Sequence, residues 1–387
     1  MRIVIAPQGF KGTLTGPEAA VAMAEGARRA LPGADVVLCP VADGGHGTLD
    51  ALVSATGGRR FRVRVTGPIG SPVEAEWGVL GGPDAAGDGG TAVVEMALAS
   101  GLTLVPEAVR DPMRATTYGT GQLIATALDA GYQRVIVGVG GSATNDGGAG
   151  AAQALGVGLL DALGHQVPHG AEALLTLEHI DPSHRHPALA EASIEVAYDV
   201  TNPLLGRDGA AMTYATQKGA TAEQIPVLEE VLTHYAAVIQ RECGVDVSQL
   251  PGGGAAGGLA AGLVALAGAK LVPGAALVCD ALGLDQRLER AALVITGEGR
   301  VDWQTVFDKA PIEVARRAAK RRIPVIAVAG SFGRDAERVL QHGVTMLESA
   351  EVPGKPAPST SADAAAALTA ATERAVRRAV AQGLVQV

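Results

Sequence analysis

The feature that most constrains the fold is a short apolar run that recurs along the chain and ends each time at a glycine-rich or polar loop. Uninterrupted apolar runs of this length are typical of strands buried on both faces, as in a parallel sheet. Alanine-rich segments with helical periodicity separate several of the runs. A strand, a loop and a helix repeated in this order predict a Rossmann-like, doubly wound α/β domain. The apolar runs are Ile3–Ala6, Val36–Leu38, Val135–Val139, Ile194–Ala197, Leu293–Ile295, Val325–Val328 and Val344–Leu347, and the predicted helices are Pro17–Leu31, Gly121–Ala130, Ala149–Leu155, Ile312–Arg321 and Asp335–Gln341.

Two stretches break this rhythm. Phe61–Val65, Val73–Leu80 and Thr91–Met96 are strand-like and have no helix between them, which predicts an antiparallel or mixed sheet. The stretch 203–289 combines a glycine-rich centre with helical segments. We therefore expect a second, mixed-sheet α/β domain inserted discontinuously, with a small-molecule site in the cleft between the domains. The predicted Rossmann-like domain comprises 1–58, 118–200 and 290–387, and the second domain comprises 59–117 and 201–289.

The composition excludes several classes of protein. The chain is 48% hydrophobic and 18% charged, which argues against global disorder. A net charge of −9 and an aromatic content of 3% argue against nucleic-acid binding. Cys39, Cys243 and Cys279 are isolated, so neither a disulfide framework nor a zinc site is expected. The chain has no recognisable signal peptide, and its longest uncharged stretch, 247–269, is rich in glycine and alanine, so we expect a cytoplasmic protein without a membrane partner.

Loops that combine glycine with hydroxyl or carboxylate residues follow five of the predicted strands. Loops at the carboxyl ends of parallel strands meet at one edge of a sheet, where their backbone N–H groups can bind an anion. Lys11, one of six lysines in the chain, adds a positive charge to the first loop. Carboxylates beside a phosphate site are expected where Mg²⁺ lies between them, which points to phosphoryl transfer. The loops are 7–13, 43–48, 138–148, 199–203 and 296–302.

Less specific interpretations of these residues stay open at this point. Any one of the loops could be only a tight turn, and Glu95 could be either a buried pairing partner or a site carboxylate. The histidines between 165 and 186 are more typical of a solvated loop than of a metal site. The pattern Gly138-x-Gly140-x-x-Ala143, with Asp161 about 20 residues later, matches a weak dinucleotide fingerprint and keeps an oxidoreductase as an alternative. The chain has neither a P-loop motif nor the protein-kinase motif set.

Several ordered motifs carry a resemblance to a known family. The chain resembles the type I glycerate kinase family over nearly its whole length. The resemblance implies ATP- and Mg²⁺-dependent phosphorylation of D-glycerate, mostly to 2-phosphoglycerate, by a Rossmann-like domain and a second α/β domain with the active site between them. The matching segments are APQGFKGTLTGPEAA (6–20), ADGGHGT (42–48), VEMALASGL (94–102), TTYGTGQLI (116–124), VGGSATNDGGAGAAQALG (139–156), DVTNPLLG (199–206), QKGA (217–220), PGGGAAGGLAAGL (251–263) and TGEGRVDWQT (296–305) with Lys309.

The sequence departs from the family pattern at the expected site. Gln8 and Gly9 replace the Asp and Ser of the usual APDSFKG, His46 replaces the Glu of ADGGEGT, and Asp308 replaces the Gly before Lys309. These changes leave two further alternatives, a member acting on another hydroxy acid and a non-catalytic ligand-binding relative. They also leave open whether phosphate would be added at the 2- or the 3-position. A homodimer is likewise left open.

The hypothesis assigns a role to each candidate residue. Lys11 binds the glycerate carboxylate, with Arg300 and Arg114 as rivals. Asp199 is the first choice as acceptor for the hydroxyl proton because it follows a buried strand. Asp43, Glu298 and Asp302 are the other catalytic candidates. Mg²⁺ is expected near Asp146 and Asp199, and the remaining candidates for substrate or phosphate binding are Gly44, Gly45, Thr48, Gly140, Gly141, Ser142, Thr144, Thr201, Asn202 and Lys309.

Overall fold

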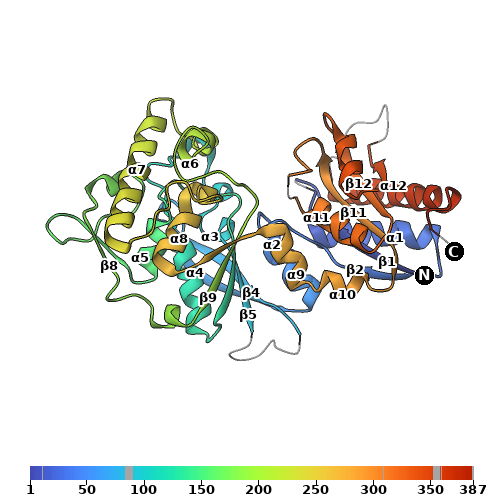
Figure 1. The fold of residues 1–387 in the computed structure, drawn as a ribbon, viewed down its shortest axis with the longest axis horizontal. Coiled ribbons are helices and arrows are strands. Elements are labelled where there is room, and N and C mark those ends of the chain that lie inside the picture. Colours follow the sequence, from blue (N-terminus) through green and yellow to red (C-terminus); the bar gives the residue numbers. More distant parts are fainter. Residues whose placement is uncertain (11, 83–89, 308, 352–357, 359, 386–387) are drawn as a thin grey trace. The chain divides into compact units, whose positions relative to one another are not determined.

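The computed structural model describes residues 1–10, 12–82, 90–307, 309–351, 358 and 360–385. The chain divides into two compact units, each built around its own sheet (Figure 1). The first unit comprises Met1–Asp43, Asp50–Gly57 and Gly274–Val387, and the second comprises Gly44–Leu49 and Gly58–Pro273. The predicted α/β class is confirmed, with one parallel sheet and one mixed sheet.

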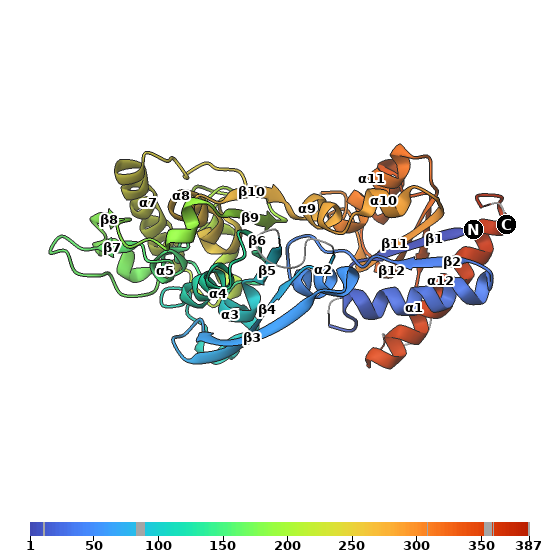
Figure 2. The same ribbon diagram turned by 90° about the horizontal axis from the view of Figure 1, so that it is seen from below.

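The first unit contains a parallel sheet of strand order β13-β12-β11-β1-β2. Its strands are β1 (Arg2–Pro7), β2 (Asp35–Leu38), β11 (Ala291–Val301), β12 (Val325–Phe332) and β13 (Met346–Ser349). Figure 2 shows α1 (Gly16–Ala30) and α12 (Ser361–Ala381) on one face, and α9 (Gly274–Ala281), α10 (Leu284–Leu288) and α11 (Ala310–Lys320) on the other. The apolar strands form a core with α1 and α12, as expected of strands buried on both faces.

The second unit contains a mixed sheet of strand order β10-β9-β6-β5-β4-β3. The pairs β3–β4 and β4–β5 are antiparallel and the others are parallel, which confirms the three strands predicted without intervening helices. The strands are β3 (Arg59–Thr66), β4 (Pro72–Val79), β5 (Thr91–Glu95), β6 (Arg134–Gly138), β9 (Ser193–Tyr198) and β10 (Lys270–Pro273), and β7 (Gly158–Leu160) pairs separately with β8 (His179–Asp181).

Helices α4 and α8 pack on the second sheet, and α5 contacts both of them. A further apolar core joins α5 and α8 to α6 and α7. The α-helices of this unit are α3 (Ala97–Ser100), α4 (Tyr118–Asp129), α5 (Ala149–Ala154), α6 (Ala210–Tyr214), α7 (Gln224–Cys243) and α8 (Leu259–Ala267), and α2 is Thr48–Thr56. Among the described residues no helix is both long and apolar enough to cross a membrane.

The division of the chain differs from the predicted one. Segment 118–200 was expected beside Ile3–Ala6, but its strands β6 and β9 pair in the second sheet, where Val137 lies in register with Val94 of β5. Segment 274–289 likewise belongs to the first unit. The physical reason is that an apolar run shows that a strand is buried on both faces, but not which sheet it joins. Asp335–Gln341, predicted as a helix, forms a 3₁₀ helix at Ala336–His342.

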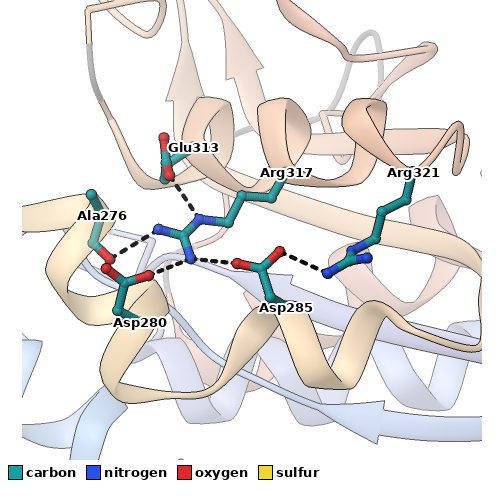
Figure 3. Close-up of polar contacts among 6 residues, drawn as sticks. All are labelled: Ala276, Asp280, Asp285, Glu313, Arg317 and Arg321. Carbon is teal, nitrogen blue, oxygen red and sulfur yellow. Dashed lines mark hydrogen bonds and ion pairs between the residues drawn. The ribbon is translucent and has the colours of Figure 1, made fainter.

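A buried arginine joins three helices of the first unit (Figure 3). Arg317 on α11 is 8% exposed, and its guanidinium donates to Glu313 of its own helix at 2.7 Å. It also donates to Asp280 at 2.6 Å and to Asp285 at 2.9 Å, which belong to α9 and α10. Arg321 reaches Asp285 at 3.2 Å. The network fixes α9 and α10 against α11.

Candidate functional site

The loops after β1 and β2 meet at the carboxyl edge of the first sheet, as predicted from the parallel topology. The backbone N–H of Gln8 donates to the carbonyl of Gly297 on β11 at 2.8 Å. The side-chain amide Nε2 of Gln8 donates to Oδ2 of Asp43, which follows β2, at 2.7 Å. Asp43 is buried. Gln8, one of the departures from the family pattern, therefore holds a candidate catalytic carboxylate in place.

Glu298 occupies the same edge, near the carboxyl end of β11. It is 7% exposed, and its two oxygens contact Thr305 Oγ1 at 2.8 Å and Lys309 Nζ at 3.3 Å. Burial raises the pKa of Glu298, Lys309 opposes that rise, and the charge of Asp43 adds to it. The arrangement places a second candidate carboxylate, Asp43, and the candidate Lys309 within electrostatic reach of Glu298. A carboxyl group with a raised pKa is suited to accept or donate a proton.

The other candidates of the first unit lie in the following turn. Asp302 accepts a hydrogen bond from the backbone N–H of Gln304 at 2.9 Å and lies 3.6 Å from Nε of Arg300. The Arg300 side chain is mostly exposed. Lys309 begins α11, so Glu298 and this helix start are held together. Lys11 and Asp308 lie outside the described residues.

In the second unit, the segment Gly44–Leu49 lies against the carboxyl edge of its sheet. A Cβ on Gly44 would come within 2.4 Å of the carbonyl oxygen of Ala197 on β9, and one on Gly140 within 2.5 Å of Gly45 Cα. Only glycine permits so close an approach of two backbones. The hydroxyl of Thr48 donates to the carbonyl of Gly45 at 2.7 Å. The predicted loops 43–48 and 138–148 therefore do meet, with Thr48 engaged in the turn.

Glu95 connects the same segment to β5. Its buried carboxylate accepts from the backbone N–H groups of Gly47 at 3.0 Å and Leu49 at 3.2 Å, at the start of α2. Nδ1 of His46, whose side chain is mostly exposed, lies 2.9 Å from Oε1 of Glu95. A carboxylate at a helix N-terminus is stabilised by the helix dipole. Of the two roles left open for Glu95, the geometry favours the buried pairing partner.

The loop after β6 is accessible at its start and buried at its end. Gly141 is exposed, whereas Ser142 is 8% exposed and Thr144 is fully buried. Asp146, predicted as a Mg²⁺ ligand, is also fully buried and accepts from Thr117 N at 2.8 Å and Thr117 Oγ1 at 2.9 Å. Its oxygens also accept from the N–H groups of Gly148 and Gly150, both at 3.2 Å.

These contacts correct the expectation for Asp146. Burial raises its pKa, and the hydrogen bonds from Thr117, Gly148 and Gly150 oppose that rise. Both oxygens bind groups that fix the start of α5, so the carboxylate supports the loop from within rather than facing a ligand. The sequence showed an acid within a glycine-rich loop, but it did not show that Thr117 would donate two hydrogen bonds to this acid.

The loop after β9 also differs from the expectation. Asp199 was the first choice as proton acceptor because it follows a buried strand, but it is exposed and acts electrostatically on Tyr214. Tyr214 donates its hydroxyl to Oδ1 of Asn202 at 2.7 Å, while the carbonyl of the exposed Thr201 accepts from Gly252 at 3.1 Å. Arg114, in the segment before α4, is exposed and lies 3.8 Å from Asp111.

The described residues contain no group of three or more His, Cys, Asp or Glu side chains arranged to hold a metal ion. Mg²⁺ that enters with a nucleotide needs only one or two protein carboxylates besides the phosphate oxygens. Asp43, Glu298 and Asp199 supply oxygen donors of the suitable kind.

Sequence reasoning assigned no role to Lys218, although it lies in the matched segment QKGA. The scarcity of lysine in this chain was the available signal.

Comparisons with known proteins agree with one another. The sequence profile described as "Glycerate kinase family" matches residues 3–380. The chain is 50% identical over 342 residues to a glycerate kinase from Halalkalibacterium halodurans, covering 88% of each chain. It is 48% identical over 344 residues to glycerate 2-kinase from Escherichia coli K12, covering 89% of each. A crystal structure from Salmonella typhimurium LT2, described as a candidate glycerate kinase 2, superposes with a TM-score of 0.88 at 45% identity and full coverage of both chains.

Proposed function

The chain belongs to the glycerate kinase family, and we propose that it transfers the γ-phosphoryl group of MgATP to the 2-hydroxyl of D-glycerate. The observation that carries the proposal is the 48% identity to the glycerate 2-kinase of Escherichia coli over 89% of each chain. The buried carboxylates at the edge of the first sheet support it, because phosphoryl transfer to an alcohol needs a proton acceptor near the attacking oxygen. A cytoplasmic location and a homodimer remain predictions from sequence and family.

The acceptor hydroxyl needs a group that takes its proton as the new phosphate bond forms. Among the candidates, Glu298 is the best suited, since its pKa is raised by burial and Thr305 and Lys309 fix its orientation. Asp43, held by Gln8, is the second candidate. Asp199 is less suited to this role because it is exposed. We propose Lys11 as the partner of the glycerate carboxylate, with the exposed Arg300 as the alternative.

The glycine loops of the second unit are proposed to bind the phosphates. Gly140 and Gly141 lie at the accessible start of the loop 139–148, beside Gly44 and Gly45. Backbone N–H groups of such loops approach phosphate oxygens without a side chain in between. Mg²⁺ bound with ATP would neutralise charge that develops on the transferred group, which is the main requirement of a loose transition state. We propose Asp199, which is exposed at the end of β9, as its protein ligand.

A first test measures ADP release by the purified protein with ATP, Mg²⁺ and D-glycerate, against L-glycerate and a panel of other 2-hydroxy acids. We expect D-glycerate to give the highest kcat/KM. Preference for another hydroxy acid would support the alternative that this family member has a different substrate. Nucleotide binding without turnover would support the alternative of a non-catalytic relative. Lys11→Ala should lower kcat/KM at least about 10²-fold, the scale for loss of one charge-stabilising group. Unchanged kinetics in that variant would remove Lys11 from the site.

A further inference from the structure

Lys218 is a charged side chain enclosed in the second unit. It ends the 3₁₀ helix Thr216–Lys218 and is 2% exposed. Its Nζ donates a hydrogen bond of 2.7 Å to the backbone carbonyl of Thr144, which is 74 residues away in the sequence. Transfer of an ammonium group from water into a protein interior is costly unless its surroundings compensate. A lysine enclosed in this way therefore calls for an explanation.

The two groups that act on the Lys218 ammonium belong to one loop. Its carbonyl partner, Thr144, lies in the loop 139–148, and Asp146, two residues later, favours the charged form of Lys218 electrostatically. The Asp146 oxygens already accept from Thr117, Gly148 and Gly150. The backbone of Gly257 also packs against the Thr144 carbonyl, because a Cβ on Gly257 would come within 2.0 Å of the Thr144 oxygen.

The loop itself has few fixed side-chain contacts at this point. Within the described part of the chain, Oγ1 of Thr144 and both amide atoms of Asn145 are buried and have no hydrogen-bond partner. A glycine-rich segment loses more conformational entropy on ordering than other sequences do. The backbone of the loop is anchored at Gly141, Ala143 and Gly147, which bond to Leu102, Ser100 and Gly257 at 2.9–3.0 Å. Its described side-chain anchors are Asp146 at the start of α5 and the bond from Lys218 to Thr144.

The same loop carries the accessible glycines. Gly141 is exposed, and only Ser142 and Ala143 separate it from Thr144. A displacement of the Thr144 carbonyl would disturb the neighbouring bonds from Ala143 to Ser100 and from Leu102 to Gly141, and through them the N–H groups of Gly140 and Gly141. A misplacement of about 1 Å at a reacting group can cost on the order of 10²-fold in rate.

We propose that Lys218 is a positioning residue that holds the loop 139–148 in its phosphate-binding conformation by donating a hydrogen bond to the Thr144 carbonyl. The proposal rests on the proposed function of that loop. It predicts that Lys218 acts on the nucleotide and not on the hydroxy acid. A purely structural lysine would instead lower the amount of folded protein and leave both KM values unchanged.

The test compares Lys218→Met with Arg317→Met. The first variant keeps a side chain of similar length but removes the Nζ donor, and the second removes a buried cation from the first unit. We expect Lys218→Met to lower kcat/KM for MgATP by about 10²-fold, with the KM for D-glycerate changed less than about twofold. Arg317→Met should be less stable but keep both KM values. Hydrogen exchange followed by mass spectrometry should show faster exchange of 142–150 in Lys218→Met only. Lys218→Gln, which replaces the ammonium donor by a neutral amide donor, should have an intermediate defect and serves as the second variant if the Met variant does not fold.

Calorimetric titration with MgADP, without any hydroxy acid, separates this proposal from the proposed function. If the wild-type protein binds MgADP but does not phosphorylate D-glycerate, the proposed function fails, and weaker MgADP binding by a folded Lys218 variant still supports the positioning role. If folded Lys218→Met or Lys218→Gln binds MgADP as the wild type does and exchanges 142–150 at the same rate, the positioning role is overturned. Equal kinetic defects in the Lys218 and Arg317 variants would overturn it as well.

Discussion

The two units each enclose a cation, but they compensate it differently. Arg317 in the first unit donates to three carboxylates, those of Glu313, Asp280 and Asp285, which lie on three helices. Lys218 in the second unit donates to one backbone carbonyl and has a carboxylate only as an electrostatic neighbour. A guanidinium with its planar set of donors suits several carboxylates at once, whereas an ammonium is a compact point charge.

The difference also appears in the direction of the two pKa shifts. Burial by itself would lower the pKa of Arg317, but hydrogen bonds from it to Glu313 and Asp280 outweigh burial and raise it. Burial lowers the pKa of Lys218 to about 7, and Asp146 offsets only part of that effect. We infer that Arg317 stabilises the scaffold, whereas Lys218 is retained at a cost to stability for what it does to the glycine loop.

The largest expected effect on stability is that of Arg317→Met. Removing one partner of a buried ion pair costs about 3–5 kcal/mol, but Asp280 is 71% exposed and Asp285 is 47% exposed, so water solvates these carboxylates and we expect a loss of about 2–3 kcal/mol. Urea unfolding should show this loss. Arg321→Met is the matched control, because Arg321 is more exposed and contacts only Asp285 in the network, so it should cost less than about 1 kcal/mol. Equal losses in the two variants would contradict the scaffold role of Arg317.

Asp146→Asn is the next largest change. The substitution replaces an acceptor-only carboxylate by a group with N–H donors facing the N–H groups of Thr117, Gly148 and Gly150. We expect a loss of about 1–3 kcal/mol, the cost of leaving a buried polar group unsatisfied. The equivalent change at Asp161, whose side chain is 30% exposed, should be smaller. Retention of full stability by Asp146→Asn would show that the carboxylate does not hold the start of α5.

The two cations should also differ in their dependence on pH. The pKa of Lys218 is about 7 in the folded chain, against 10.5 as the ordinary value. Between these values the unfolded chain binds more protons, so stability rises with pH. The free energy of unfolding of the wild type minus that of Lys218→Met should therefore increase above about pH 7, by at most about 1.4 kcal/mol per pH unit.

The control for this experiment is Arg317→Met. Arginine stays protonated in both the folded and the unfolded chain over this range, so the corresponding difference should be independent of pH. Urea unfolding of the three proteins at several pH values between about 7 and 9 measures both differences. A flat difference for Lys218→Met would mean that this lysine stays charged in the interior.

The smallest expected effect is that of His46→Ala. Because the His46 side chain is mostly exposed, its contact with Glu95 should contribute less than about 1 kcal/mol. His46→Glu restores the usual family residue but places a second carboxylate beside Glu95, so it should be less stable than His46→Ala. Thermal unfolding compares the two variants. Greater stability of the Glu variant would imply a different position for this side chain.

Much of the fold could be predicted from the sequence, because apolar runs and alternating runs mark buried and half-buried strands. The partner of each strand could not, and β6 and β9 were assigned to the wrong sheet for that reason. At the site, loops after parallel strands did predict the meeting of Gln8, Asp43 and Glu298. Solvent exposure at a strand end is decided by the neighbouring loops, so the exposure of Asp199 and the burial of Asp146 depended on contacts that the sequence does not reveal.

The most direct test of the central claim follows the product of the wild-type protein. The protein is incubated with D-glycerate, ATP and Mg²⁺, and the product is offered to enolase with and without phosphoglycerate mutase. Since enolase accepts 2-phosphoglycerate, we predict formation of phosphoenolpyruvate without the mutase, in an amount equal to the ADP released. A requirement for the mutase would place the phosphate on the 3-hydroxyl, and the absence of ADP release by the folded protein would contradict a glycerate kinase.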